Sequence, residues 1–425
     1  MLVAPGLEIT EHPDTWVQKV RPDVLQTFES QIYGRVPDVE VGLDWSVLEE
    51  GRTEDGRRRR QLAVRFTGPH GVAKVLLLVY LPAPAGNRGP DREGAGAERG
   101  TIPAFLGLNF QGNHACTTDP GVIQVGTDLP ESETGSVYYD QHASYPVPPP
   151  RGNNAAAWPF HLANERGYAV ITAHYLQTGP DHPDMFHRGL LPIFGEVSLQ
   201  DRPRDGGGAI AMWAWVLRRL LDGLGRGMVP EVHPGQVWAI GHSRLGKTAL
   251  WAAAQDDRFA GVISNNSGRM GAAHTRPVGE HLPTMIKQFP HWFAPNFLHR
   301  VQAGEPLPVD QHQLLASIAP RPLYVASASA DHHADPEGEF AAWQSAAAAW
   351  PPDANPDPSA GKGAHRDPTE VTSSGLTFPR PGEHLVHPDL PLGYHLRAGE
   401  HAVQPFDWER WLDFRDGLDR TGQQG

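Results

Sequence analysis

The hydrophobic positions of the chain form short runs that alternate with longer, helix-like segments. The runs are rich in Val, Ile and Leu and predict buried strands at residues 74–82, 104–110, 168–175, 236–243, 261–266 and 322–329. Amphipathic or apolar segments of helical length predict helices at residues 208–224, 244–255 and 338–350. This alternation predicts an α/β fold, with a mainly parallel sheet and helices on both faces in three layers.

Further elements are predicted outside these runs. Residues 21–34 predict an amphipathic helix before the sheet, and the alternation at 61–68 predicts an antiparallel strand at its start. Two segments, 86–100 and 351–383, are rich in Gly, Pro and charge and predict insertions without regular structure. No segment clearly forms a linker between two hydrophobic cores, so we expect one domain over residues 1–425.

The composition disfavours some classes of binding partner. The formal net charge of -13 disfavours nucleic acid and anionic membranes, which bind basic surfaces. A single cysteine, Cys116, excludes an internal disulfide framework. The sequence shows no uncharged apolar run long enough for a membrane span and no leader at its start, although a chain whose leader had been removed would look the same. We therefore expect a soluble monomer without a cofactor.

The stretch GHSRLGK, residues 241–247, carries the first chemical signal. Ser243 follows an apolar run and precedes a predicted helix. One interpretation makes it an ordinary helix N-cap, since Ser is favoured there. The other makes it a nucleophile on a sharp turn between strand and helix.

The rest of the chain supplies partners for a nucleophile. In α/β-hydrolases the triad follows the chain order Ser, acid, His, each on a loop after a strand. Asp331 follows the run at 322–329, and His401 follows the strand-like residues 393–397. Other candidates remain. His395 is the rival base, while Asp335 and Glu339 compete as the acid, with Asp335 read as a helix cap.

The motif departs from the general pattern G-x-S-x-G. Leu245 holds the position two residues after the serine, and Gly246 comes third. Arg244 and Lys247 also place two cations beside the nucleophile, which favours a substrate with anionic or strongly polar groups.

This motif resembles that of the glucuronoyl esterases of carbohydrate esterase family 15, and the bacterial branch is most similar. The resemblance runs from about residue 20 to 418 and is carried by several stretches in the same order, among them FLGLNFQGNH, VISNNSG, FPHWFAPNF, DHHADPEGEF and GYHLRAGEHAVQPFDW. It implies hydrolysis of esters between glucuronic acid and lignin alcohols in glucuronoxylan.

The resemblance also implies residue roles. Ser243 is then the nucleophile, His401 the base, Asp331 the acid, and Arg244 an oxyanion donor. Lys247 and Glu280 resemble residues that contact the sugar.

Two positions depart from the family. Asn266 stands where fungal members carry the acid, and an amide cannot hold an imidazolium as a carboxylate does. His333 replaces a tryptophan that often packs on the sugar, which puts that contact in doubt.

Other functions stay open. The chain could act on acetylated sugars or simple esters, or it could be a non-catalytic carbohydrate-binding protein that keeps the fold. The histidines of residues 182–187 and 331–333 raise a metal hypothesis, but no H-E-x-x-H or cysteine-rich pattern accompanies them, so we predict no metal in the site.

Overall fold

The computed structural model describes residues 6–9, 12–83, 100–138, 140, 148–195, 202–351 and 376–422. The predicted insertions at 86–100 and 351–383 therefore lie mostly outside the described residues. Among the described helices, none combines the length and the apolar character needed to cross a lipid bilayer.

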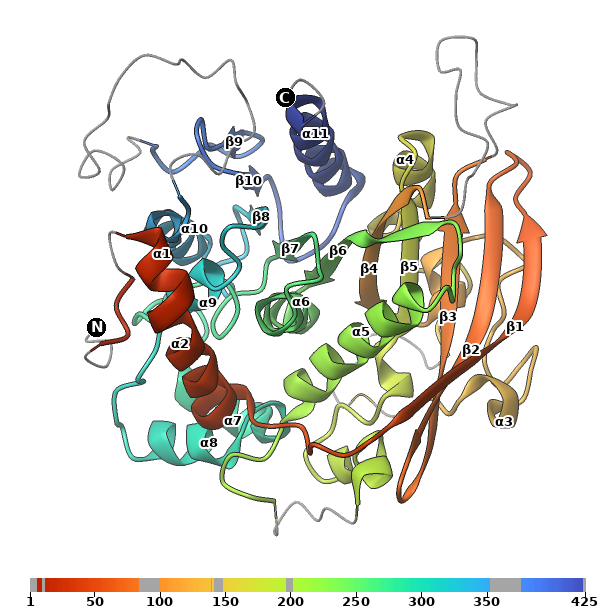
Figure 1. The fold of residues 1–425 in the computed structure, drawn as a ribbon, viewed down its shortest axis with the longest axis horizontal. Coiled ribbons are helices and arrows are strands. Elements are labelled where there is room, and N and C mark those ends of the chain that lie inside the picture. The colour runs from red at the N-terminus through yellow and green to blue at the C-terminus, as the bar shows by residue number, and fades with distance from the viewer. Residues whose placement is uncertain are drawn as a thin grey trace.

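A single ten-stranded sheet organises the molecule (Figure 1), in the order β1-β2-β3-β5-β4-β6-β7-β8-β10-β9. The strands are β1 (Gly42–Arg52), β2 (Arg58–Gly68), β3 (Gly71–Leu81), β4 (Ile102–Asn109), β5 (Ala169–His174), β6 (Val232–His242), β7 (Gly261–Asn265), β8 (Leu323–Ala328), β9 (His384–Val386) and β10 (Leu392–Arg397).

Six neighbouring strands of the sheet, β5, β4, β6, β7, β8 and β10, pair in parallel, as the sequence predicts. At one edge β1, β2 and β3 form an antiparallel ribbon that joins β5, and β2 is the antiparallel strand expected at 61–68. At the other edge β9 pairs antiparallel with β10. The α/β prediction is confirmed, while β1 and β9 were not predicted.

The helices are α1 (Pro13–Thr15), α2 (Arg21–Phe28), α3 (Glu131–Thr134), α4 (Phe160–Glu165), α5 (Ala209–Gly225), α6 (Arg244–Gln255), α7 (Leu282–Gln288), α8 (Pro295–Gln302), α9 (Gln311–Ala316), α10 (Pro336–Ala346) and α11 (Pro405–Gly422). The predicted helices at 208–224, 244–255 and 338–350 correspond to α5, α6 and α10. The segment 21–34 contains α2 and a further helical turn that ends at Tyr33.

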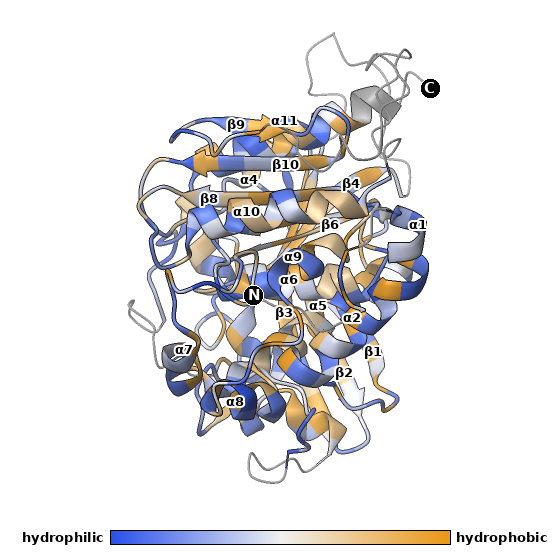
Figure 2. Cartoon of the chain, turned by 90° about the vertical axis from the view of Figure 1, so that its left-hand side faces the viewer, coloured by the Kyte–Doolittle hydropathy of each residue, from blue (hydrophilic) through white to orange (hydrophobic). Residues whose placement is uncertain are grey.

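Alternate side chains of the central strands serve two cores, one on each face of the sheet. Leu106, Ala239 and Val262 pack with α5 and α6, whereas Phe105, Trp238 and Ile263 pack with α4 and α11. Figure 1 shows these helix pairs on opposite sides of the sheet. Figure 2 shows hydrophobic residues along strands such as β4 and hydrophilic residues on the outlying helix α8. Both faces of the sheet are therefore covered, which explains why its strands read as continuous apolar runs.

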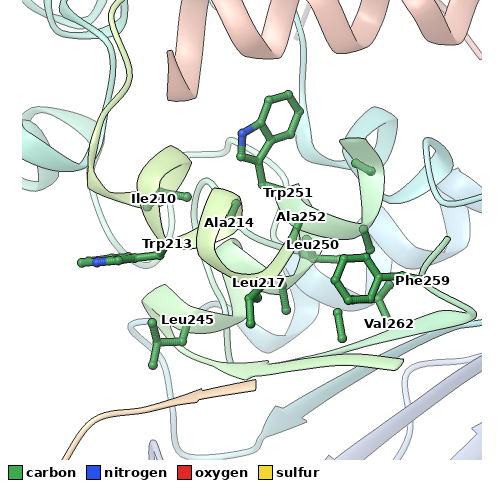
Figure 3. Close-up of a cluster of buried hydrophobic side chains, with 14 of the residues drawn as sticks. Ile210, Trp213, Ala214, Leu217, Leu245, Leu250, Trp251, Ala252, Phe259 and Val262 are labelled. Carbon is green, nitrogen blue, oxygen red and sulfur yellow. The ribbon is translucent and has the colours of Figure 1, made fainter. Parts of the chain in front are cut away.

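The larger core fixes the helix that follows the candidate nucleophile. Figure 3 shows side chains of α5 beside those of α6 and Val262 of β7; the labelled members of the two helices are Ile210, Trp213, Ala214, Leu217, Leu245, Leu250, Trp251 and Ala252. Trp213 and Trp251 are almost fully buried. Because burying one large apolar side chain contributes about 1.5–3 kcal/mol, α6 is held firmly against the sheet.

Candidate active site

Ser243 lies on the turn between β6 and α6 in a backbone conformation that is rare for residues with a Cβ. Its φ is 56° and its ψ is -129°. The turn is held because the Ser243 amide donates to the Asn265 carbonyl at 2.9 Å, and the Ser243 carbonyl accepts from the amides of Gly246 and Lys247. The serine side chain caps no amide of α6. This geometry disfavours the N-cap interpretation and fits a hydroxyl presented at a sharp turn.

Asp331 and His401 form the acid–base pair that the strand order predicts. Asp331 follows β8, His401 follows β10, and the His401 Nδ1 lies 2.5 Å from the Asp331 Oδ2. The Asp331 side chain is 3% exposed and that of His401 is 40% exposed. Burial raises the pKa of Asp331, but hydrogen bonds and the charge of His401 outweigh it and hold the pKa below its ordinary value. An ionised Asp331 therefore keeps the proton on Nδ1 and leaves Nε2 free.

Two further amides fix the Asp331 carboxylate. The Asn266 side chain donates from Nδ2 to Oδ2 at 2.8 Å, and the Ala334 amide donates to Oδ1 at 3.2 Å. Asn266 itself has a positive φ of 45°. The asparagine that cannot replace the acid thus orients it.

Ser243 and His401 line one cavity of about 400 Å³. The described residues contain no hydrogen bond between the serine hydroxyl and the imidazole. Such bonds are often loose without substrate and tighten in the complex. Polar side chains of Gln111 and Asn153 and the apolar ring of Trp158 complete part of the wall. The cavity can therefore hold a polar ligand against the serine.

His242 is a site residue that the sequence reasoning did not assign. Its ring lies 4.5 Å from the His401 ring, measured between centroids, and its Nδ1 is 2.8 Å from the Asn265 Oδ1. Burial, aided by the charge of His401, lowers the pKa of His242 to about 3, so the ring is neutral at ordinary pH. A histidine directly before the nucleophile was the one available signal.

Arg244 is fixed at the cavity edge by a buried carboxylate. Its Nη1 forms an ion pair with Asp181, which has no exposed side-chain surface, and its guanidinium lies 4.8 Å from the Trp292 ring centre. Burial lowers the pKa of Arg244, but the charge of Asp181 and its neighbours outweighs it and raises the pKa overall. The arginine is thus a positioned cation whose Nε is buried without an acceptor among the described residues.

Asp181 was missed by the sequence reasoning. One carboxylate oxygen accepts from His291 Nε2 at 2.7 Å and from Trp292 Nε1 at 2.8 Å, while the other accepts from Arg244. Burial raises its pKa, but the charge of Arg244 and these donors together hold it well below the ordinary value. Asp181 directly precedes residues 182–187, which the metal hypothesis singled out, and it holds the arginine.

Lys247, Glu280 and His333 form a second cluster. The Lys247 ammonium is buried and donates to the Ser267 carbonyl at 2.6 Å. Glu280 Oε1 lies 3.3 Å from His333 Nε2, and this contact raises the pKa of His333. Burial lowers the pKa of Lys247, partly offset by Glu280. None of the three is among the described residues that line the Ser243 cavity.

The rival residues have other partners. His395 is fully buried, and its Nε2 lies 2.8 Å from Asp407 Oδ1. Asp335 accepts from the Gly338 amide and caps α10, as predicted. Glu339 accepts from Ser327 Oγ at 2.5 Å and from the Gly268 amide at 2.8 Å, and burial raises its pKa to about 8. A carboxyl group that is neutral at pH 7 is a poor partner for an imidazolium.

Comparisons with known proteins point to one family of enzymes. A family model described as glucuronyl esterase, fungi, matches residues 200–352. Carbohydrate esterase MZ0003, from an unknown prokaryotic organism, is 33% identical over 422 residues and covers 98% of this chain and 88% of the relative. A solved glucuronoyl esterase from Solibacter usitatus has a TM-score of 0.76 and 31% identity, covering 98% of both chains.

A second solved structure, described as a promiscuous esterase of carbohydrate esterase family 15 from a marine bacterial metagenome, has a TM-score of 0.75 and 30% identity, with 98% of this chain and 96% of that chain covered. The fold is that of the α/β-hydrolases, and the protein is a carboxylic ester hydrolase. More specifically, the chain belongs to carbohydrate esterase family 15, the glucuronoyl esterases.

Proposed function

We propose that the protein hydrolyses esters of glucuronic acid and its 4-O-methyl ether, such as those that join glucuronoxylan to lignin alcohols, through a glucuronoyl-serine intermediate. One observation carries this proposal most directly: the bond between His401 Nδ1 and Asp331 Oδ2, beside a cavity that also contains Ser243 and Arg244. The names of the relatives supply the substrate class.

The reaction proceeds in two acyl transfers. His401 Nε2 takes the hydroxyl proton as Ser243 Oγ attacks the C6 carbonyl carbon of the ester, and Asp331 stabilises the imidazolium. The tetrahedral intermediate collapses, the C6–O bond to the alcohol breaks, and His401 protonates the leaving oxygen. Water then attacks the acyl-serine with His401 again as base, which releases the glucuronic acid and restores Ser243.

Arg244 stabilises the charge that develops on the carbonyl oxygen. Its guanidinium is already oriented by Asp181, so its donors need little reorganisation in the transition state. A lost oxyanion donor costs about 3–4 kcal/mol in comparable sites. Lys247, Glu280 and His333 contact the sugar beyond the cavity, with the polar His333 in place of the aromatic surface that the family often presents.

The principal alternative is an esterase with a preference for other carbohydrate or simple esters. The description of one solved relative as promiscuous gives this alternative its support. In either case the same three residues perform the chemistry, and only the sugar contacts differ.

The test compares benzyl glucuronate with benzyl acetate and acetylated xylan, for the parent protein and for Ser243→Ala. We expect the parent to have its highest kcat/KM on benzyl glucuronate. Ser243→Ala should lose at least about 10⁴-fold of that activity while it keeps the parent's thermal unfolding curve.

Two results would count against this proposal in different ways. A higher kcat/KM on acetate esters would show that the proposed substrate class is wrong, but it would leave the proposed mechanism unchanged. Near-parental hydrolysis by Ser243→Ala would remove Ser243 from the mechanism altogether.

A further inference from the structure

Three potential metal ligands lie together outside the catalytic cavity. His274 comes from the loop after β7, and Asp310 and His312 come from the N-terminal end of α9. One ligand atom from each lies within 4.8 Å of the other two. None of these side chains lines the Ser243 cavity, and the proposed function does not use them.

His274 turns one ring nitrogen toward the carboxylate of Asp310. Its Nδ1 lies 2.9 Å from the Asp310 Oδ2, while the nearest partner of its Nε2 is the Ser345 hydroxyl at 3.4 Å. Either a proton on Nδ1 or a metal ion therefore lies between the imidazole and the carboxylate.

Asp310 is oriented independently of any metal. Its Oδ1 accepts from the amides of Gln311 at 2.8 Å and Thr275 at 2.9 Å, and its own amide donates to Gln313 in a capping box at the start of α9. Oδ2 is left to face His274. A carboxylate held in this way is a preorganised ligand that needs little side-chain entropy to coordinate a metal.

His312 distinguishes the metal from the proton. Its ring centre lies 4.9 Å from that of His274, and its Nδ1 is buried without a partner among the described residues. A proton between His274 and Asp310 leaves this nitrogen of His312 without a partner. A metal ion between the rings provides the missing partner and replaces that proton.

We propose that His274, Asp310 and His312 bind a Zn²⁺ ion that ties the loop after β7 to α9. Two imidazole nitrogens and one carboxylate oxygen form a ligand set typical of zinc, whereas Mg²⁺ and Ca²⁺ prefer oxygen ligands. Ligand atoms around tetrahedral zinc lie about 3.3 Å apart, so modest side-chain rotations close the site, and water completes the coordination.

The loop held by this ion leads to Glu280. Its next residue, Thr275, already binds Asp310 through its amide, and the His274 amide donates to the Gly338 carbonyl of α10 at 3.2 Å. The metal therefore adds a further attachment between this loop and the two helices. Its role is structural, because none of its three ligands is among the described residues that line the Ser243 cavity.

The experiment titrates Zn²⁺ into the EDTA-treated, tag-free full chain by calorimetry and follows Tm in parallel. We expect one equivalent to bind the parent and to raise its Tm by about 3 °C at a hundredfold excess over Kd. His312→Ala and His274→Ala should each lose that equivalent. The control His299→Ala changes an exposed histidine on α8 and should bind as the parent does.

Two variants of the site keep the test valid if one of them fails to fold. Co²⁺ gives an independent signal, since a tetrahedral site with two nitrogen ligands should produce visible absorption that both variants lack. The proposal is overturned if the parent binds no more Zn²⁺ than His312→Ala does. The pair His274–Asp310 would then hold a proton only.

Discussion

Ser243 carries its strain because its neighbours hold the backbone on both sides. A non-glycine residue at positive φ costs on the order of 1–3 kcal/mol and persists only where the surrounding structure enforces it. Here the Asn265 carbonyl and two amides of α6 supply that restraint. The same restraint keeps the hydroxyl away from the helix amides that a capping serine would bind.

Two buried carboxyl groups near the site differ in charge because their partners differ. Asp331 accepts hydrogen bonds from His401, Asn266 and Ala334, which favour its ionised form. Glu339 is fully buried and accepts hydrogen bonds from the neutral groups of Ser327, Gly268 and Ser267, so burial prevails and its pKa rises to about 8. The pair therefore offers a matched test of which carboxylate serves the histidine.

Asp331→Asn should lower kcat by about 10⁴-fold, because an amide cannot stabilise the imidazolium and favours the wrong tautomer of His401. Glu339→Gln, which removes the neighbouring carboxyl group, should keep kcat near the parental value. Steady-state kinetics on benzyl glucuronate measure both. Equal losses in the two variants would show that Asp331 has no special part in the reaction.

The control variant Glu339→Gln should also change how the stability of the protein depends on pH. Between its ordinary pKa of 4.5 and the folded value of about 8, Glu339 holds a proton in the folded state that the unfolded chain has released. The free energy of unfolding therefore falls as the pH rises through this window. Glu339→Gln cannot titrate, so its Tm should fall less than the parental Tm over the same range. Parallel Tm curves would contradict the assignment.

The sequence points to Ser243, Asp331 and His401 as the proposed triad, because each follows a predicted strand in the expected chain order. Asp181 could not be found in this way. Its partners Arg244 and His291 lie 63 and 110 residues away in the sequence, and no spacing rule joins them. The pairing of Glu280 with His333 was equally hidden, because no spacing rule joins the loop after β7 to the loop after β8.

At the scale of elements, the departure from the general serine motif has a packing reason. Leu245 is 1% exposed and belongs to the core between α6 and the sheet, so the position cannot be glycine without loss of that contact. Gly246 is instead the position at which α6 closely approaches the chain after β7, since a Cβ there would lie 2.9 Å from the Cβ of Ser267. Helix α6 therefore meets the end of β7 one residue later than the general motif implies.

Gly241→Ala tests the turn itself. A Cβ at this position would lie 1.9 Å from the Leu245 carbonyl oxygen, so the backbone between β6 and α6 has to move. We expect a stability loss of about 1–3 kcal/mol and a fall in kcat of at least about 10²-fold, as misplacement of a nucleophile gives. Urea unfolding and ester hydrolysis measure the two effects.

A glycine without such contacts is the control for this change. A Cβ on Gly417 in α11 would meet nothing within 4 Å, so Gly417→Ala should stabilise the helix slightly and leave kcat unchanged. If Gly241→Ala behaved in the same way, the tight turn would not be required for activity.

The elements differ in how far the sequence reveals them. The central strands and α5 and α6 are buried on most sides, which leaves continuous apolar runs to read. Strand β1 has a single fully buried position, Leu43, because it lies at the sheet edge, and charged residues mask its alternation. Strand β9 has only three residues and gives no periodic signal.

At the scale of the whole molecule, the site exists because of the order of strands in the sheet. Strands β6, β7, β8 and β10 are consecutive neighbours and run in parallel, so their carboxyl ends meet at one edge. Ser243, Asn266, Asp331 and His401 follow these four strands in turn. The sequence predicts the strands and their direction, but adjacency depends on crossovers that no local pattern encodes.

The measurement that tests the central claim most directly is covalent labelling with a serine-reactive phosphonate, followed by peptide mass spectrometry. The geometry predicts a single modification, on Ser243, with loss of ester hydrolysis in proportion to the label. His401→Ala, which lacks the base, should label much more slowly. Modification of another residue with loss of activity, or full activity with Ser243 labelled, would contradict the account.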